Sequence, residues 1–249
     1  EEKHQGQRCS TFANAAISER LDNMPERFAL SGYQSIMDLL NLVNHISSGE
    51  HPVFKEETEI HFFGYSIGAF LAQVLMIANP NGLLDRSRFV LFAGGTVFSH
   101  INGISKFIID QQAFEQLRTY YLNQDSWRRK TLKSYVKVLE IKNIARAFMA
   151  MLSPEYFSKL REKVFAEFND RMLVYALRDD EVFPEECILS NFHDSGVWVN
   201  RIDFPYNYTH ETPFPVSSDP EISDRVDRSF DHLLSEMCNF LKDEINYGV

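Results

Sequence analysis

Residues 88–93, Arg-Phe-Val-Leu-Phe-Ala, form an almost uninterrupted apolar run that ends at two adjacent glycines, Gly94 and Gly95. Such a run is typical of a strand buried on both faces of a parallel sheet, whereas a half-exposed antiparallel strand alternates apolar and polar residues. A second strand pattern at residues 59–63 comes earlier, and a helical pattern at 69–78 separates the two. The order strand, helix, strand predicts an α/β fold with a mostly parallel sheet and helices on both faces.

The same alternation returns near the C-terminus after a long stretch without strand patterns. Residues 172–177 and 197–203 read as further strands, and between the two pairs of strands residues 99–170 show helical patterns alone. We therefore predict an α/β core formed by residues 1–98 and 171–249, with a helical cap inserted at 99–170 after the second strand. A C-terminal amphipathic helix is expected to cover one face of the sheet with an apolar stripe, formed by Val226, Phe230, Leu233, Leu234, Met237 and Leu241.

The composition narrows the range of partners. The 249 residues include 25 Lys and Arg against 35 Asp and Glu, so the formal charge is 25 − 35 = −10, and 44% of the residues are hydrophobic. The apolar content is enough for a packed core, and the negative charge opposes binding to nucleic acid, because phosphate contacts depend on Lys and Arg. The longest apolar run, residues 67–78, is well short of the roughly 20 residues that span a bilayer.

Three cysteines, Cys9, Cys187 and Cys238, are widely spaced and odd in number. They match neither a disulfide framework nor a paired metal motif, which favours a reducing, cytoplasmic location. Metal-ligand spacings, a phosphate loop and a dinucleotide fingerprint are also missing from the sequence, so we predict no metal and no cofactor.

The sharpest motif is Gly64-Tyr65-Ser66-Ile67-Gly68, between a predicted strand and a predicted helix. A nucleophilic serine at such a turn adopts a strained backbone, and the chain passes so close that small residues are needed two positions to either side. Gly64 and Gly68 meet this expectation. Because the motif lies at a helix N-terminus, the Ile67 N–H is a candidate donor to a developing oxyanion. A plain tight turn between strand and helix is the alternative interpretation.

A serine nucleophile needs a base and an orienting acid. Asp180 follows the strand at 172–177 and is the candidate acid; the alternative interpretation is that Asp179, Asp180 and Glu181 form a solvated acidic turn that caps the following helix. His210 follows the last strand through a loop and is the candidate base. His193 is expected at the opposite edge of the sheet, and His232 beside core positions of the C-terminal helix.

The motif at 64–68, Asp180 four residues before Pro184, and His210 after the last strand occur in the order Ser, Asp, His. This order resembles the α/β-hydrolase superfamily, and the resemblance covers the chain from about residue 30 to its end. It implies a catalytic triad of Ser66, Asp180 and His210, and a cap at 99–170 whose Phe, Tyr and Met residues line an acyl-binding cleft.

The chain departs from that superfamily in one respect. Residues 1–56 contain helical patterns and irregular chain but no convincing strand, whereas the superfamily has several strands before the serine motif and takes a second oxyanion donor from that region. The chain begins at Glu1 rather than Met. The sequence therefore favours a C-terminal part of a longer polypeptide, with an upstream segment as a partner of the sheet.

We predict a serine hydrolase that cleaves a carboxylic ester, thioester or amide of a small-molecule acyl substrate. Two alternatives stay open: a catalytically inactive binding or scaffold protein of the same fold, and a serine peptidase. The peptidase uses the same acyl-transfer groups and differs in the shape of its pocket. The sequence does not specify an oligomeric state.

Overall fold

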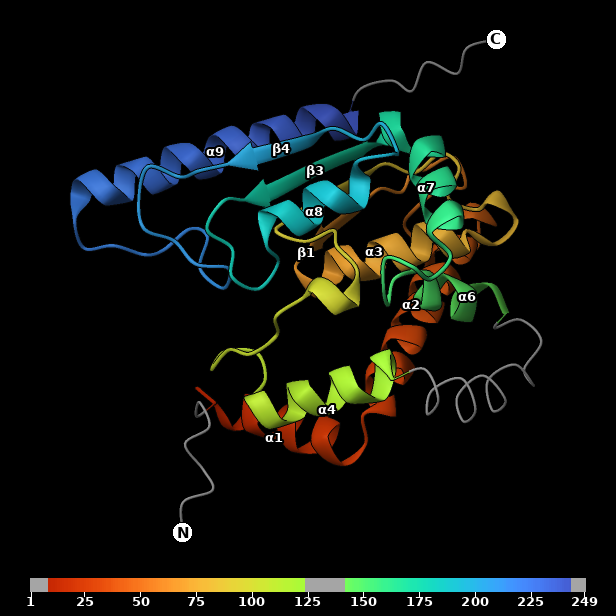
Figure 1. The fold of residues 1–249 in the computed structure, drawn as a ribbon. Coiled ribbons are helices and arrows are strands. Elements are labelled where there is room, and N and C mark those ends of the chain that lie inside the picture. The colour runs from red at the N-terminus through yellow and green to blue at the C-terminus, as the bar shows by residue number, and fades with distance from the viewer. Residues whose placement is uncertain (1–8, 124–141, 243–249) are drawn as a thin grey trace.

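A computed structural model describes residues 9–123 and 142–242, and its centre is a sheet of four parallel strands. The strands lie side by side in chain order (Figure 1). The α/β class and the parallel sheet predicted from the sequence are therefore confirmed. The strands are β1 (Phe62–Tyr65), β2 (Phe89–Phe92), β3 (Met172–Leu177) and β4 (Val199–Ile202).

Helices connect the parallel strands, and further helices precede β1 and follow β4 along the chain. Parallel neighbours need a crossover connection, and helices provide it between β1 and β2 and between β3 and β4. The helices are α1 (Phe12–Asn23), α2 (Glu26–Ser47), α3 (Ile67–Ala78), α4 (Gln111–Leu122), α6 (Lys142–Ala150), α7 (Ser158–Glu167), α8 (Glu185–Phe192) and α9 (Pro220–Lys242), with short 3-10 turns at Pro80–Gly82, Phe98–His100 and Asn169–Arg171.

Successive residues of β2 pack on opposite faces of the sheet. Phe89 and Leu91 belong to the larger core cluster, which includes residues of α3 and α8, whereas Val90 and Phe92 join Leu233 of α9 in a second cluster. Figure 1 shows α9 running along one side of the sheet, away from α3. Helices thus cover both faces, which explains why β2 is apolar along its whole length.

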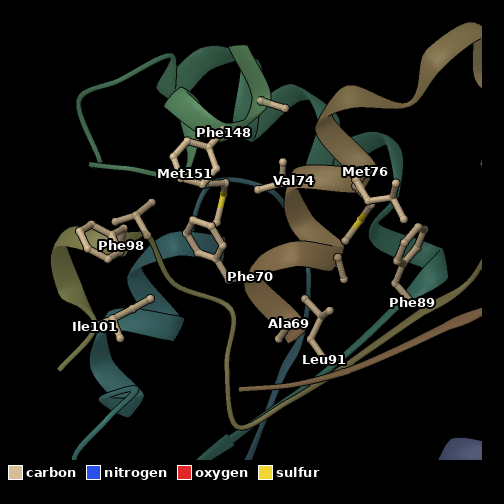
Figure 2. Close-up of a cluster of buried hydrophobic side chains, with 14 of the residues drawn as sticks. Ala69, Phe70, Val74, Met76, Phe89, Leu91, Phe98, Ile101, Phe148 and Met151 are labelled. Carbon is tan, nitrogen blue, oxygen red and sulfur yellow. The ribbon is translucent and has the colours of Figure 1, made fainter. Parts of the chain in front are cut away.

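Helix α3 lies in the middle of the larger cluster and is apolar nearly all round, as a fully buried helix must be. Figure 2 shows Ala69 of α3 next to Leu91 of β2, and Phe70 of α3 beside Phe98 and Met151. Helices α6 and α7 pack directly against α3. The N-terminal end of α3, which follows Ser66, is therefore held by a continuous packed core.

The described helices within residues 99–170 have two different packing partners. Helices α6 and α7 lie in the core against α3, because their apolar faces are buried there, whereas α4 packs against α1, which the sequence placed in the α/β core. Figure 1 shows α1 and α4 together, on the side of the molecule away from α9. The remaining part of the predicted cap, residues 124–141, lies outside the described residues.

The predicted strand boundaries need small corrections. The sequence placed the first strand at 59–63, but β1 begins at Phe62 and continues through Gly64 and Tyr65, which pair with Leu91 and Phe92 of β2. Glycine is weak in strands, so the pattern ended the strand too early. In the C-terminal helix, Val226 and Leu233 are buried as expected, but Phe230 and Leu234 are about half exposed.

Candidate active site

Ser66 occupies the turn between β1 and α3 with a strained backbone. Its φ of 57° and ψ of −122° lie outside the ordinary regions for a residue with a side chain. Such strain persists only where the surroundings fix the conformation, and here Tyr65 is held in the sheet on one side and α3 begins on the other. The Ser66 carbonyl accepts the N–H of Ala69 at 3.0 Å, which closes the first turn of the helix.

Two glycines allow this turn, but they are not the two expected from the sequence. A Cβ on Gly64 would lie 2.7 Å from backbone atoms of Gly68 and Ala69, so no side chain fits there. A Cβ on Gly68, in contrast, would meet nothing within 4 Å, so the expected steric need for glycine at 68 is wrong. The second crowded position is Gly94, where a Cβ would lie 2.7 Å from the Ser66 carbonyl oxygen.

Ser66, His210 and Asp180 form one continuous chain of hydrogen bonds. The Ser66 Oγ lies 2.7 Å from Nε2 of His210, and Nδ1 of the same ring lies 2.8 Å from Oδ2 of Asp180. All three residues follow the carboxyl ends of parallel strands, Ser66 after β1, Asp180 after β3 and His210 after β4. The structure therefore brings together the three side chains that the sequence singled out, 144 and 30 positions apart along the chain.

Asp180 is buried, and both oxygens of its carboxylate have hydrogen-bond partners. Its Oδ1 accepts the backbone N–H of Val182 at 2.8 Å and of Phe183 at 2.7 Å, which leaves Oδ2 for His210. A buried carboxylate needs such partners, because an unpaired charge away from water is strongly unfavourable. Its neighbours Asp179 and Glu181 are exposed, so the solvated acidic turn is made by them and not by Asp180.

The His210 ring is held between two aromatic side chains. Tyr65 stacks at a centroid distance of 5.5 Å and Phe183 at 5.4 Å, with interplanar angles of 22° and 19°. The Tyr65 hydroxyl also donates a hydrogen bond to the His210 carbonyl oxygen. Burial raises the pKa of Tyr65 to about 12, with added effects from the negative charges of Asp180 and Glu211, so the hydroxyl stays a neutral donor near neutral pH.

The two other candidate histidines lie elsewhere on the surface. His193 contacts Asp194 at 2.8 Å and its side chain is 81% exposed. His232 lies on the solvent side of α9, next to the buried Leu233, and its Nε2 lies 3.8 Å from the carboxylate of Glu236. In α9 it is Leu233, one position on, that is buried against the sheet.

The backbone N–H of Ile67 is the first of α3 and therefore has no intrahelical acceptor. Among the described residues, no other acceptor binds it either. The positive end of the helix dipole adds to this N–H, so the position suits a negatively charged oxygen bound next to Ser66. The Ile67 N–H is the oxyanion donor predicted from the sequence, and its position at the start of α3 is compatible with that role.

An apolar cleft of about 590 Å³ opens beside Ser66. Its walls come from α1, α2, α4, the start of α3, and the loops after β2 and β3. Helix α1 was not expected to contribute, and among the described lining residues there are Phe side chains but no Tyr or Met. The lining residues are Asn14, Ile17, Leu21, Phe28, Ser31, Ser66, Ile67, Phe98, Ile101, Gly103, Phe107, Ile108, Ile109, Phe114, Leu117, Val182 and Phe183.

One further contact joins the histidine loop to the cleft wall. The Ser105 hydroxyl donates to the carboxylate of Glu211, the residue after His210. Ser105 lies in the loop that carries the cleft residues Gly103 and Phe107.

Three residues of the site, Glu211, Phe183 and Gly94, were not predicted from the sequence. Of these, Gly94 had a readable signal, since a glycine pair directly after a buried strand often marks a close backbone approach.

The described residues contain neither a metal-binding cluster nor a membrane span. Over 9–123 and 142–242, no group of three or more His, Cys, Asp or Glu side chains is arranged to hold a metal ion. Cys9, Cys187 and Cys238 are free thiols. In the same ranges, no helix has the length and hydrophobicity needed to cross a bilayer.

Fold and site together define an α/β protein in which a strained serine, a histidine and an aspartate meet at the carboxyl edge of a parallel sheet. The chain belongs to a family of unknown function, DUF6051, whose model matches residues 1–242. No curated protein matches the sequence.

Proposed function

We propose that this protein is a serine hydrolase that cleaves a carboxylic ester, thioester or amide through an acyl-enzyme on Ser66. The observation that carries the proposal is the hydrogen-bond chain from Ser66 through His210 to Asp180, with distances of 2.7 and 2.8 Å. Nucleophile, base and orienting acid are recognised by this geometry and not by sequence position. The resemblance to the α/β-hydrolase superfamily, in the order of the three residues and the strained serine turn, supports the same proposal.

The first half of the reaction forms the acyl-enzyme. With Nδ1–H of His210 donated to Asp180, Nε2 accepts the Ser66 proton while Oγ bonds to the substrate carbonyl carbon. The carbonyl π electrons move onto oxygen, where the Ile67 N–H stabilises the charge. As the carbonyl reforms, the bond to the leaving group breaks, and the leaving oxygen, sulfur or nitrogen takes the proton from His210.

The second half releases the acid. A water molecule gives a proton to Nε2 of His210 as its oxygen attacks the acyl carbon, and the Ser66 oxygen then leaves and takes that proton back. Asp180 keeps its charge throughout and stabilises the imidazolium in each half. The two backbone N–H groups that donate to Oδ1 stabilise the carboxylate in this role.

A non-catalytic scaffold protein of the same fold is the main alternative. That interpretation would be favoured by a His210 ring out of reach of Ser66 and Asp180. Both distances are instead within hydrogen-bond range, and Ser66 itself has a strained backbone, with φ of 57° and ψ of −122°, which a passive turn does not require. These two observations favour the hydrolase.

The test is covalent labelling with a fluorophosphonate probe that carries a short alkyl group, read by intact mass. We expect one adduct on the wild-type protein and none on Ser66→Ala. Ser35→Ala is the matched control, because Ser35 is an exposed serine on α2 whose hydroxyl binds only the Ser31 carbonyl oxygen among the described residues. A folded wild-type protein without an adduct, or an adduct that persists on Ser66→Ala, would refute the proposal.

A further inference from the structure

We propose that the cleft beside Ser66 binds the acyl chain of an uncharged, aliphatic substrate. This inference rests on the proposed function and extends it, since acyl-transfer chemistry alone leaves the acyl group undefined. The nucleophile itself lines the cleft, so a carbonyl placed on Ser66 has its acyl chain at the entrance. The volume of about 590 Å³ falls within the usual range for small-molecule sites, roughly 300–1,000 Å³.

Most of the residues that line the cleft are aliphatic or aromatic. Ile17 and Leu21 of α1 form one wall, Leu117 of α4 another, and Phe98 and Ile101 of the loop after β2 lie deeper in the core. Each methylene that moves from water into such surroundings contributes favourable free energy, whereas a polar group gains nothing there. The composition of the walls therefore favours a hydrocarbon chain.

No residue of the described cleft lining carries a formal charge. Two of its polar side chains are already engaged, because the amide of Asn14 donates to the Phe107 carbonyl oxygen at 2.7 Å and the Ser31 hydroxyl donates to the Phe28 carbonyl oxygen at 3.1 Å. A carboxylate or ammonium group on the acyl chain would lose its water without gaining a partner. The cleft thus discriminates against charged acyl groups.

The cleft is held in shape by the core behind it. Figure 2 shows Phe98 and Ile101, two lining residues, on the same side of the buried cluster as Phe70. Phe98 also contacts Phe28 and Phe114, both of which line the cleft, at centroid distances of 5.4 and 6.4 Å. Because these rings pack against one another, the acyl chain of the substrate would enter a preformed site. A preformed site lowers the free-energy cost of binding.

The experiment is a chain-length series of p-nitrophenyl esters from acetate to decanoate, with Ser66-dependent hydrolysis as the readout. We expect kcat/KM to rise with each added methylene until the cleft is filled, by up to about fourfold per group, which corresponds to ~0.8 kcal/mol. The monoester of adipic acid has the hexanoate chain with a terminal carboxylate, and its kcat/KM should be at least tenfold lower than that of hexanoate. A flat or falling series, or equal rates for these two esters, would overturn the inference.

A variant pair separates the cleft from the rest of the protein. Leu21→Trp adds volume to a half-buried lining residue and should shift the preferred ester toward shorter chains, seen as a lower ratio of kcat/KM for decanoate to kcat/KM for acetate. Leu234→Trp is the matched control, because Leu234 lies on α9 and is 45% exposed. Leu234→Trp should leave the whole series unchanged. If Leu21→Trp also leaves the preference for ester chain length unchanged, the acyl chain does not bind in this cleft.

The same data distinguish this inference from the proposed function. A protein that is neither labelled by the short fluorophosphonate nor active on acetate fails as a serine hydrolase. A protein that is labelled on Ser66 and hydrolyses acetate, but shows no preference for longer chains, remains a hydrolase and refutes only the assignment of the cleft.

Discussion

Tyr65 stacks on the His210 ring at a centroid distance of 5.5 Å and donates its hydroxyl hydrogen bond to the His210 carbonyl oxygen. The residue directly before the serine therefore positions the ring that faces the serine. Because Tyr65 pairs with Phe92 in the sheet, it connects the histidine loop to the rigid part of the fold. A loop residue alone would not hold an imidazole in one place.

The first prediction concerns this contact. Tyr65→Phe keeps the stacked ring but removes the hydroxyl, so the histidine loop loses a hydrogen bond that contributes about 1 kcal/mol. We expect kcat/KM for the acetate ester to fall by about fivefold, which corresponds to ~1 kcal/mol, with the loss in kcat and not in KM. A merely structural role would lower the free energy of unfolding and leave kcat of the folded protein unchanged.

The second prediction concerns the acid. Asp180→Asn keeps the shape but removes the charge that orients His210, and turnover is expected to fall by roughly 10³–10⁴-fold, as in other Ser-His-Asp sites. Asp179→Asn, the same change at the exposed neighbour, should alter turnover by less than about twofold. Steady-state hydrolysis of the acetate ester measures both. Equal losses for the two variants would show that Asp180 is not the orienting acid.

The third prediction compares Gly64 and Gly68, the two glycines of the serine motif. Gly64→Ala places a Cβ against the backbone of Gly68 and Ala69 and should destabilise the protein by about 1–3 kcal/mol. Gly68→Ala meets open space within α3, and the better helix propensity of alanine should stabilise by about 0.5–1 kcal/mol. Urea unfolding of both variants gives the comparison. A stable Gly64→Ala protein would contradict the close approach.

The fourth prediction concerns alkaline pH. Burial raises the pKa of Tyr65 to about 12 and also raises the pKa of Tyr175 in the folded protein, whereas both titrate near 10 when unfolded. The unfolded chain therefore releases these protons first, so their contribution is fully present below pH 10 and is lost as the pH rises toward 12. Urea midpoints should fall between pH 10 and pH 12, and the decline should be shallower for Tyr65→Phe. An equal decline for both proteins would contradict a raised Tyr65 pKa.

The sequence predicted the sheet well because a buried parallel strand has an unmistakable composition. Residues 88–93 and 172–177 coincide with β2 and β3 almost residue for residue. The same reasoning placed Ser66, Asp180 and His210 at one sheet edge, since the carboxyl ends of parallel strands share it. Once the serine motif had singled out Ser66, the convergence of the three side chains followed from their positions after strands of one parallel sheet.

What could not be read from the sequence is how the helices pack. The apolar faces of α4 and α6 look alike in one dimension, yet α4 pairs with α1 and α6 lies against α3. Periodicity shows that a helix face is buried but not which partner buries it. The stacking of Phe183 on His210 had no signal either, since a phenylalanine after a strand is an ordinary core residue.

The groups proposed to make and break bonds come from the ends of β1, β3 and β4, whereas Ile17, Leu21 and Leu117 come from two helices that contribute none of those groups. The proposed function therefore assigns reactivity and selectivity to separate stretches of the chain. On that proposal, a mutant library confined to those three positions changes which esters are accepted and leaves Ser66, His210 and Asp180 untouched, so the α1–α4 pair is where the substrate range would be engineered.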